Sequence, residues 1–140
     1  MRYAIVVGRF YEALAERLVA SAREIFEEAG AEAIDVYDVP GAFELPLAAL
    51  TVAQSGRYDG VACLGAVIRG ETSHYDYVCA EAARGITEVM LRTGVPCGFG
   101  VLTVENMDQA LARTAGGKRD QGEHAAVAVL ALARIRASLA

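Results

Sequence analysis

Short apolar runs alternate along this chain with longer stretches that carry apolar residues at helical spacing. Residues 3–7 read YAIVV, a continuous apolar run typical of a parallel strand buried on both faces. The stretch 12–29 has apolar residues three and four positions apart, which predicts an amphipathic helix that Gly30 ends. The alternation recurs, predicting strands at 34–39, 60–68 and 97–104 and helices at 43–54, 72–91, 107–113 and 122–139. These strand–helix units with short connections predict one three-layer α/β domain over residues 1–140, with a parallel sheet covered by helices on both faces.

Composition and charge limit the partners of such a domain. A formal net charge of −5 argues against a nucleic-acid partner. Hydrophobic residues make up 54% of the chain, much of it alanine, yet no stretch approaches the roughly 18 apolar residues that a membrane span needs. The excess apolar surface indicates burial between subunits. Because an apolar run follows Met1 and Arg2 directly, we expect no signal peptide and a cytoplasmic location.

The cysteines and histidines do not have the spacing of a metal site. Cys63, Cys79 and Cys97 fall in three different predicted elements, which predicts reduced thiols that act as small hydrophobic side chains. His74 and His124 lie far apart, and the chain has no CxxC or HxxxH motif. We therefore expect no metal ion.

Chemically versatile residues gather in the loops that follow the predicted strands. In an open α/β sheet, ligands bind outside the carboxyl ends of the strands. The loops at that edge are residues 8–10, 40–44, 69–74 and 105–106, whereas those at the opposite edge contain ordinary turn residues. The carboxyl edge is therefore the predicted site.

The segment 64–79 reads LGAVIRGETSHYDYVC and passes from a predicted strand through a turn into a helix. A helix start presents unpaired N–H groups that bind phosphate, although plain capping by Thr72 or Ser73 explains the same residues. His74 shares a helical stripe with Val78 and is expected to point inward. It is either a core histidine or a group that exchanges protons near neutral pH.

The segment 39–46 reads VPGAFELP and brings a turn, an aromatic ring and a carboxylate to the same edge. A ring such as Phe10 or Phe43 can stack on a flat heterocycle while neighbouring backbone groups read its edges. Alternatively, Phe43 is a core residue and Glu44 complements the start of a helix. Pro46 is compatible with that helix only in its first turn.

A basic cluster, Arg113, Lys118 and Arg119, surrounds the break before the last predicted helix. Such clusters are usually solvated surface. The string GGKRDQG lacks the GxxxxGK[ST] spacing and follows no strand, so it is not a P-loop, and the chain has no GxGxxG motif.

Taken together, the segments VVGRF, VPGAFELP, LGAVIRGETSHYDYVC, FGVLT and ENMDQALAR resemble those of the lumazine synthase family in order and approximate spacing. The resemblance extends from Ile5 to the last predicted helix. It implies a flavodoxin-like α/β/α sandwich with a four-stranded parallel sheet in the order 2-1-3-4. It also implies a transferase of riboflavin biosynthesis that needs no cofactor or metal. This enzyme condenses 5-amino-6-(D-ribitylamino)uracil with 3,4-dihydroxy-2-butanone 4-phosphate to 6,7-dimethyl-8-ribityllumazine.

The same resemblance implies a role for individual residues at the pyrimidine end of the site. Phe10 corresponds to the ring that stacks on the pyrimidine. Contacts to the uracil and ribityl parts correspond to Gly41, Ala42 and Glu44, and the pocket is lined by Val67 and Ile68.

At the phosphate end, the resemblance implies that Glu71 and Thr72 offer backbone N–H groups to the phosphate and that His74 transfers protons. Phe99 and Arg113 match positions that the family supplies from the adjacent subunit, with Arg113 holding the phosphate. The resemblance therefore implies a homo-oligomer with shared active sites, a pentamer at least, and either a bare pentamer or a 60-subunit icosahedral shell.

Two positions depart from the family pattern. Tyr11 stands where the family usually has asparagine, and Gln121 stands where it has a lysine near the phosphate. The loss of that lysine keeps a non-catalytic lumazine- or flavin-binding oligomer open as an alternative. A flavodoxin-like electron carrier is disfavoured, because residues 8–10 do not form a Ser/Thr-rich phosphate loop.

Overall fold

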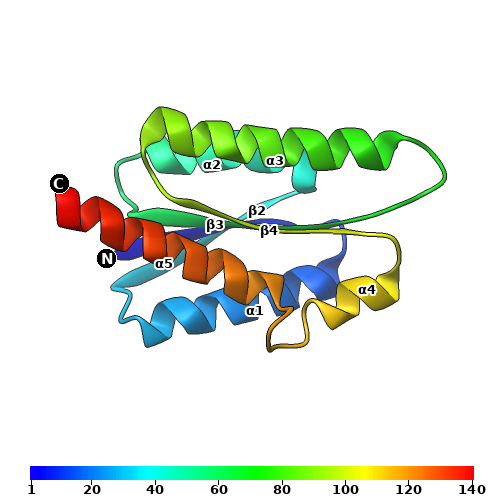
Figure 1. Cartoon of the computed structure of the whole chain (residues 1–140), viewed down its shortest axis with the longest axis horizontal. Helices are drawn as coiled ribbons and strands as arrows, with labels where there is room; N and C mark the ends of the chain where they lie inside the picture. Colours follow the sequence, from blue (N-terminus) through cyan, green and yellow to red (C-terminus); the bar gives the residue numbers. More distant parts are fainter.

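The computed structural model describes residues 1–140 and contains one four-stranded parallel sheet in the order β2-β1-β3-β4. The strands are β1 (Arg2–Gly8), β2 (Ala33–Val39), β3 (Gly60–Ile68) and β4 (Cys97–Val104). Figure 1 shows the sheet edge-on between two helical layers. The α/β sandwich and the strand order expected from the resemblance are both confirmed.

The helices lie close to their predicted positions. They are α1 (Glu12–Glu28), α2 (Leu45–Gln54), α3 (His74–Thr93), α4 (Met107–Ala112) and α5 (Gln121–Leu139), with a 3₁₀ turn η1 (Ala42–Glu44) before α2. Pro46 lies in the first turn of α2, where its missing N–H costs no helical hydrogen bond. Gly94 ends α3 in the left-handed conformation, with φ at 72°. None of these helices is both long and apolar enough to span a membrane.

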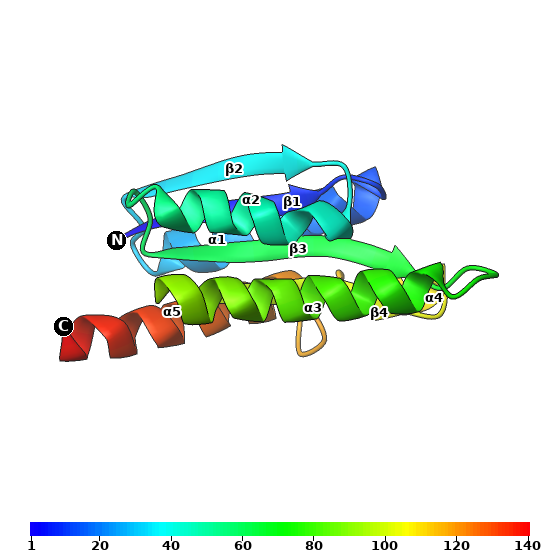
Figure 2. The same ribbon diagram turned by 90° about the horizontal axis from the view of Figure 1, so that it is seen from above.

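The central strand β1 is buried from both sides, which is why its sequence is continuously apolar. Ile5 and Val7 belong to a core of 18 buried residues beneath α1 and α5. Ala4 and Val6 belong to a core of 16 buried residues beneath α2 and α3. Figure 2 shows α2 and α3 side by side over the sheet, with β2 at one edge.

Two of the three cysteines behave as predicted. Cys63 and Cys97 are buried free thiols in the core beneath α2 and α3, whereas Cys79 is only partly buried. The pKa of Cys63 is raised well above its ordinary value by a hydrogen bond with Cys97 and by burial. These thiols therefore contribute packing rather than reactivity.

The register of the sheet creates a step at the carboxyl edge. The pairing of β1 with β3 ends at Val7 and Leu64, whereas β3 continues alongside β4 to the pair Ile68 and Val104. Residues 66–68 therefore extend past the end of β1 and are only partly covered. This step forms one wall of the site described next.

Candidate active site

A cavity of about 480 Å³ opens at the carboxyl ends of β1, β2 and β3. This volume lies within the range of roughly 300–1,000 Å³ typical of small-molecule sites. Eight of the predicted site residues line it, namely Phe10, Gly41, Ala42, Glu44, Val67, Ile68, Thr72 and His74. The predicted edge of the sheet is thus where the structure has its cavity.

The loop after β2 forms one side of the cavity. Gly41 donates its N–H to Oε1 of Glu44 at 3.0 Å, which closes the turn at the start of η1. Gly41 also passes so close to Gly8 that a Cβ on Gly8 would lie 2.9 Å from the Gly41 carbonyl carbon. The ring of Phe43 is 59% exposed, so the interpretation of Phe43 as a core residue is wrong. This loop presents an aromatic face and backbone groups to the cavity together.

Phe10 lies on the opposite side, in the turn between β1 and α1. Its side chain is 75% exposed, and its ring meets the ring of Tyr11 edge to face at a centroid distance of 4.9 Å. Because so little of the chain covers it, the Phe10 ring is free to pack against a flat ligand.

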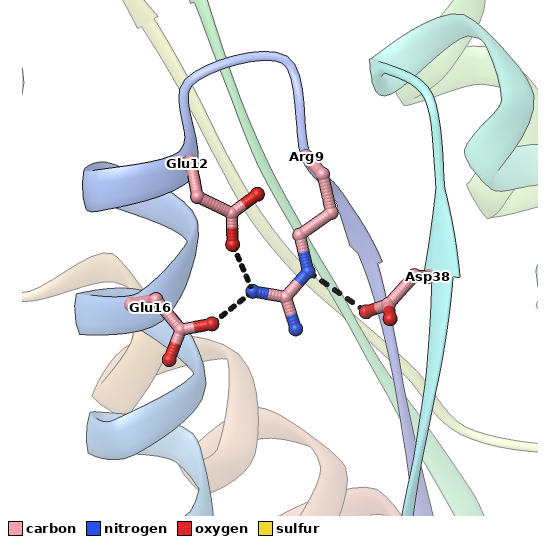
Figure 3. A network of polar contacts seen from close by, with 4 residues as sticks. All are labelled: Arg9, Glu12, Glu16 and Asp38. Atoms are coloured by element: carbon pink, nitrogen blue, oxygen red, sulfur yellow. Dashed lines mark hydrogen bonds and ion pairs between the residues drawn. The ribbon is translucent and has the colours of Figure 1, made fainter.

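Arg9 anchors the turn that carries Phe10. Its N–H donates to the carbonyl oxygen of Val39 at 2.9 Å, and its side chain makes ion pairs with Asp38, Glu12 and Glu16 (Figure 3). Burial lowers the pKa of Arg9, but the hydrogen bonds and charges of these carboxylates outweigh it and raise the pKa above the ordinary arginine value. Arg9 thereby ties β1, β2 and α1 together directly beside the cavity.

His74 begins α3 at the mouth of the cavity. Val78, on the same stripe, is buried as expected, but His74 itself, the first residue of α3, is exposed. The interpretation of His74 as a core histidine is therefore wrong, although the residue does line the cavity. An exposed imidazole at a cavity mouth is accessible to a ligand.

The residues before α3 leave backbone donors open. Ser73 occupies the N-cap position without a side-chain capping bond, and Thr72 accepts only a hydrogen bond of 3.3 Å from the N–H of His74. The N–H groups of residues 71–73 donate to no group of this chain. Capping by Thr72 therefore accounts for the N–H of His74, whereas the donors of residues 71–73 stay available for an anion.

Arg69 and Tyr75, which the motif analysis did not single out, complete this end of the site. Tyr75 lines the cavity, and its pKa is raised by burial and by the neighbouring Cys79. The guanidinium of Arg69 lies over the Tyr75 ring at 4.3 Å and pairs with Glu105 and Asp76. The sequence signal that could have identified Arg69 as a site residue was its position inside the VIRG run. Nothing in the sequence shows which groups its side chain contacts.

Three predicted site residues do not line the cavity of a single chain, namely Glu71, Phe99 and Arg113. Phe99 is 38% exposed on the edge strand β4. Arg113 directly follows α4, and its Nη1 donates to the carbonyl oxygen of Gln109 at 2.9 Å. Within one subunit, Phe99 and Arg113 do not meet the groups around His74.

The amino-acid sequence matches known proteins of one family along nearly its whole length. Residues 1–137 match the family model of 6,7-dimethyl-8-ribityllumazine synthase. The chain is 43% identical over 141 residues to the 6,7-dimethyl-8-ribityllumazine synthase of Desulfovibrio desulfuricans, covering 99% of this chain and 90% of that relative. It is 44% identical over 140 residues to the synthase of Synechococcus elongatus, covering 96% of this chain and 77% of that relative. The chain belongs to the lumazine synthase family.

The two departures from the lumazine synthase pattern occupy different places. Tyr11 lines the cavity beside Phe10. Gln121 begins α5, where its N–H donates to the carbonyl oxygen of Arg113 at 3.0 Å and its side chain meets His124 at 3.3 Å. Tyr11 therefore contributes to the cavity of its own subunit. Gln121 instead contacts the segment that contains Arg113.

Proposed function

We propose that this chain condenses 5-amino-6-(D-ribitylamino)uracil with 3,4-dihydroxy-2-butanone 4-phosphate to give 6,7-dimethyl-8-ribityllumazine. One observation carries the proposal: an aromatic ring, a backbone turn and the start of α3 with His74 surround a single cavity at the carboxyl edge of the sheet. The amine of the uracil substrate attacks the ketone of the phosphorylated substrate. The adduct then loses water and becomes a Schiff base. Phosphate then leaves, and ring closure with loss of a second water completes the product.

The pyrimidine end of the site lies between Phe10 and the loop after β2. The exposed Phe10 ring offers a stacking face, and the backbone of Gly41 and Ala42 offers polar groups beside it. Glu44 contacts the polar uracil or ribityl groups through its carboxylate, while Val67 and Ile68 form an apolar wall. A flat ring with a polar edge fits this combination of surfaces.

The phosphate end lies at the start of α3. The free N–H groups of Glu71 and Thr72, together with the positive end of the helix dipole, favour a phosphate there. His74 is within the same turn and transfers protons during Schiff base formation and phosphate loss. Most of the rate enhancement comes from orienting two small molecules that already tend to react.

Each site is completed by a neighbouring subunit, which supplies Phe99 and Arg113. An exposed aromatic ring on an edge strand and an arginine outside its own cavity support this arrangement. Further apolar side chains on α3 and α5 are exposed in the single chain, among them Tyr77, Leu91, Ile135 and Leu139. In a closed ring of subunits, every cavity gains a neighbour's Arg113. The resemblance to the lumazine synthase family implies that this ring is a pentamer, either alone or within a shell of 60 subunits.

Incubating the purified protein with both substrates tests the activity directly, since the lumazine product is fluorescent. Product formation above the uncatalysed rate supports the proposal. Tight binding of lumazine or a flavin without any rate enhancement would instead favour a non-catalytic binding oligomer. Light scattering on the same sample measures the assembly, and a monomer that is fully active would contradict the shared site.

A further inference from the structure

Arg69 follows β3 directly and contacts three groups from two other parts of the fold. Its Nε pairs with Oε2 of Glu105 at 2.8 Å, in the loop after β4. Its Nη2 pairs with Oδ1 of Asp76 at 3.4 Å, and its guanidinium carbon lies 4.3 Å from the centre of the Tyr75 ring. The side chain therefore joins the first turn of α3 to the loop that leads into α4.

On the α3 side, these contacts reach the cavity itself. Tyr75 lines the cavity next to His74, and Asp76 belongs to the same helical turn. This turn has no side-chain cap at Ser73. Its only side-chain capping bond is the one of 3.3 Å from the N–H of His74 to Thr72, and the contacts of Arg69 with Tyr75 and Asp76 add to it.

On the α4 side, hydrogen bonds continue from Glu105 to Arg113. The N–H of Glu105 donates to Oε1 of Gln109 at 2.8 Å, and the N–H of Gln109 donates to Oδ1 of Asn106 at 2.9 Å. The carbonyl oxygen of Gln109 accepts from Nη1 of Arg113 at 2.9 Å. A continuous set of contacts thus runs from the cavity wall at Tyr75 to Arg113.

We propose that Arg69 is a positioning residue that orients two half-sites together: the His74 turn for its own cavity and, through Glu105, the α4 segment that presents Arg113 to the next subunit. This inference rests on the proposed function, because it takes the shared site as given. An arginine is needed because its planar guanidinium pairs with two carboxylates while its face covers an aromatic ring. A lysine keeps the charge but cannot make this set of contacts.

Steady-state kinetics of Arg69→Gln and Arg69→Lys test the positioning role. We expect Arg69→Gln to raise KM for the phosphorylated substrate roughly tenfold with a smaller fall in kcat, because misplaced groups lose orientation. Arg69→Lys should recover only part of this loss. The matched control is Arg84→Gln, which also removes an arginine paired with two carboxylates on α3, Glu81 and Glu88, outside the cavity. Full recovery by lysine would overturn the geometric role in favour of charge alone.

A double-mutant cycle separates positioning from direct contact with the substrate. If Arg69 acts through Glu105, then Glu105→Gln should also raise KM, and the double variant should be little worse than either single variant. If Arg69 instead binds the substrate phosphate, Glu105→Gln would release the guanidinium and leave KM unchanged or lower. That second result would overturn the proposal.

Amide hydrogen exchange provides a readout that does not depend on activity. In Arg69→Gln, we expect exchange several-fold faster in both peptides 70–77 and 105–113, and no change there in Arg84→Gln. If the wild-type protein forms no lumazine, the proposed function fails, yet exchange still shows whether Arg69 restrains both segments. Unchanged exchange in either peptide would overturn the proposal even in a fully active enzyme.

Discussion

Arg9 donates a hydrogen bond of 2.8 Å from Nε to Oδ1 of Asp38, which joins the end of β1 to the end of β2. The same guanidinium pairs with Glu12 and Glu16 at the start of α1. Neither partner of this ion pair lines the cavity, yet Arg9 immediately precedes Phe10, which does. The orientation of the proposed stacking ring therefore depends on a charge cluster outside the cavity.

Replacing Arg9 should weaken binding of the pyrimidine substrate in particular. Arg9→Gln leaves three carboxylates close together and releases the turn that carries Phe10, so we expect KM for ribitylaminouracil to rise several-fold. Steady-state kinetics with each substrate varied in turn measures this effect. The control is Arg17→Gln, which changes an exposed arginine on α1, the helix that carries Glu12 and Glu16. An increase confined to KM for the phosphorylated substrate would contradict this role.

His74→Ala should slow the reaction without abolishing it. General acid–base assistance from one group typically contributes about 10²–10⁴-fold, and the remaining orientation effects persist in the variant. The rate of lumazine formation under saturating substrates is the measurement, and Thr87→Ala, an exposed change on α3 outside the cavity, is the control. A variant as fast as the wild type would exclude His74 from catalysis.

Arg113→Ala should mainly raise KM for the phosphorylated substrate, because it removes a charged partner of the phosphate. If this arginine serves the adjacent subunit, oligomers co-assembled from Arg113→Ala and His74→Ala subunits should regain activity. Roughly a quarter of the sites in an equal, random mixture would then contain both residues. Mixed oligomers no more active than the separate variants would argue that each subunit uses its own Arg113.

The stability of the fold should decrease in alkaline solution partly through Cys63. The folded state raises the pKa of this thiol through its hydrogen bond with Cys97 and its burial, whereas the unfolded chain ionises it at about pH 8.5. Below that pH both states are protonated and the stabilising contribution is complete. As pH rises toward the folded-state pKa, only the unfolded state loses the proton, so stability falls by up to about 1.4 kcal/mol per pH unit.

Cys63→Ala should therefore flatten the decrease of the free energy of unfolding between pH 8 and 10. Urea unfolding of both proteins under reducing conditions measures the difference, with pH 6.5–7.5 as the internal control, where the offset between them should stay constant. Parallel pH profiles up to pH 10 would show that this thiol does not contribute.

The sequence was sufficient for the layered fold because burial leaves a local periodic record. The continuous apolar run of β1 and the helical stripe of α1 reflect burial on two faces and on one face, respectively. The strand order 2-1-3-4 came from the family resemblance, since local periodicity does not determine which strands are neighbours.

Most of the cavity was also predictable from sequence, because parallel strands bring their following loops to one edge. Residues 41–44 and His74 therefore line the same cavity. In the sheet, β1 lies between the strands that precede these two segments, and in the chain, α2 and β3 lie between the segments. The predictions that failed concern exposure. Phe43 lies in a 3₁₀ turn rather than in the core, and His74 is exposed at the first residue of α3. Helical spacing gives the direction of a side chain but not whether another element covers it.

The amino-acid sequence by itself determined the alternation of strands and helices, the edge that carries the site and the types of side chain available there. The tertiary structure alone decided which charged groups meet. Arg9 reaches Asp38 because β2 lies beside β1, and Arg69 reaches Glu105 because β4 lies beside β3. Ion pairs of this kind depend on distances of a few ångströms between segments far apart in the chain, and only the packed sheet sets those distances.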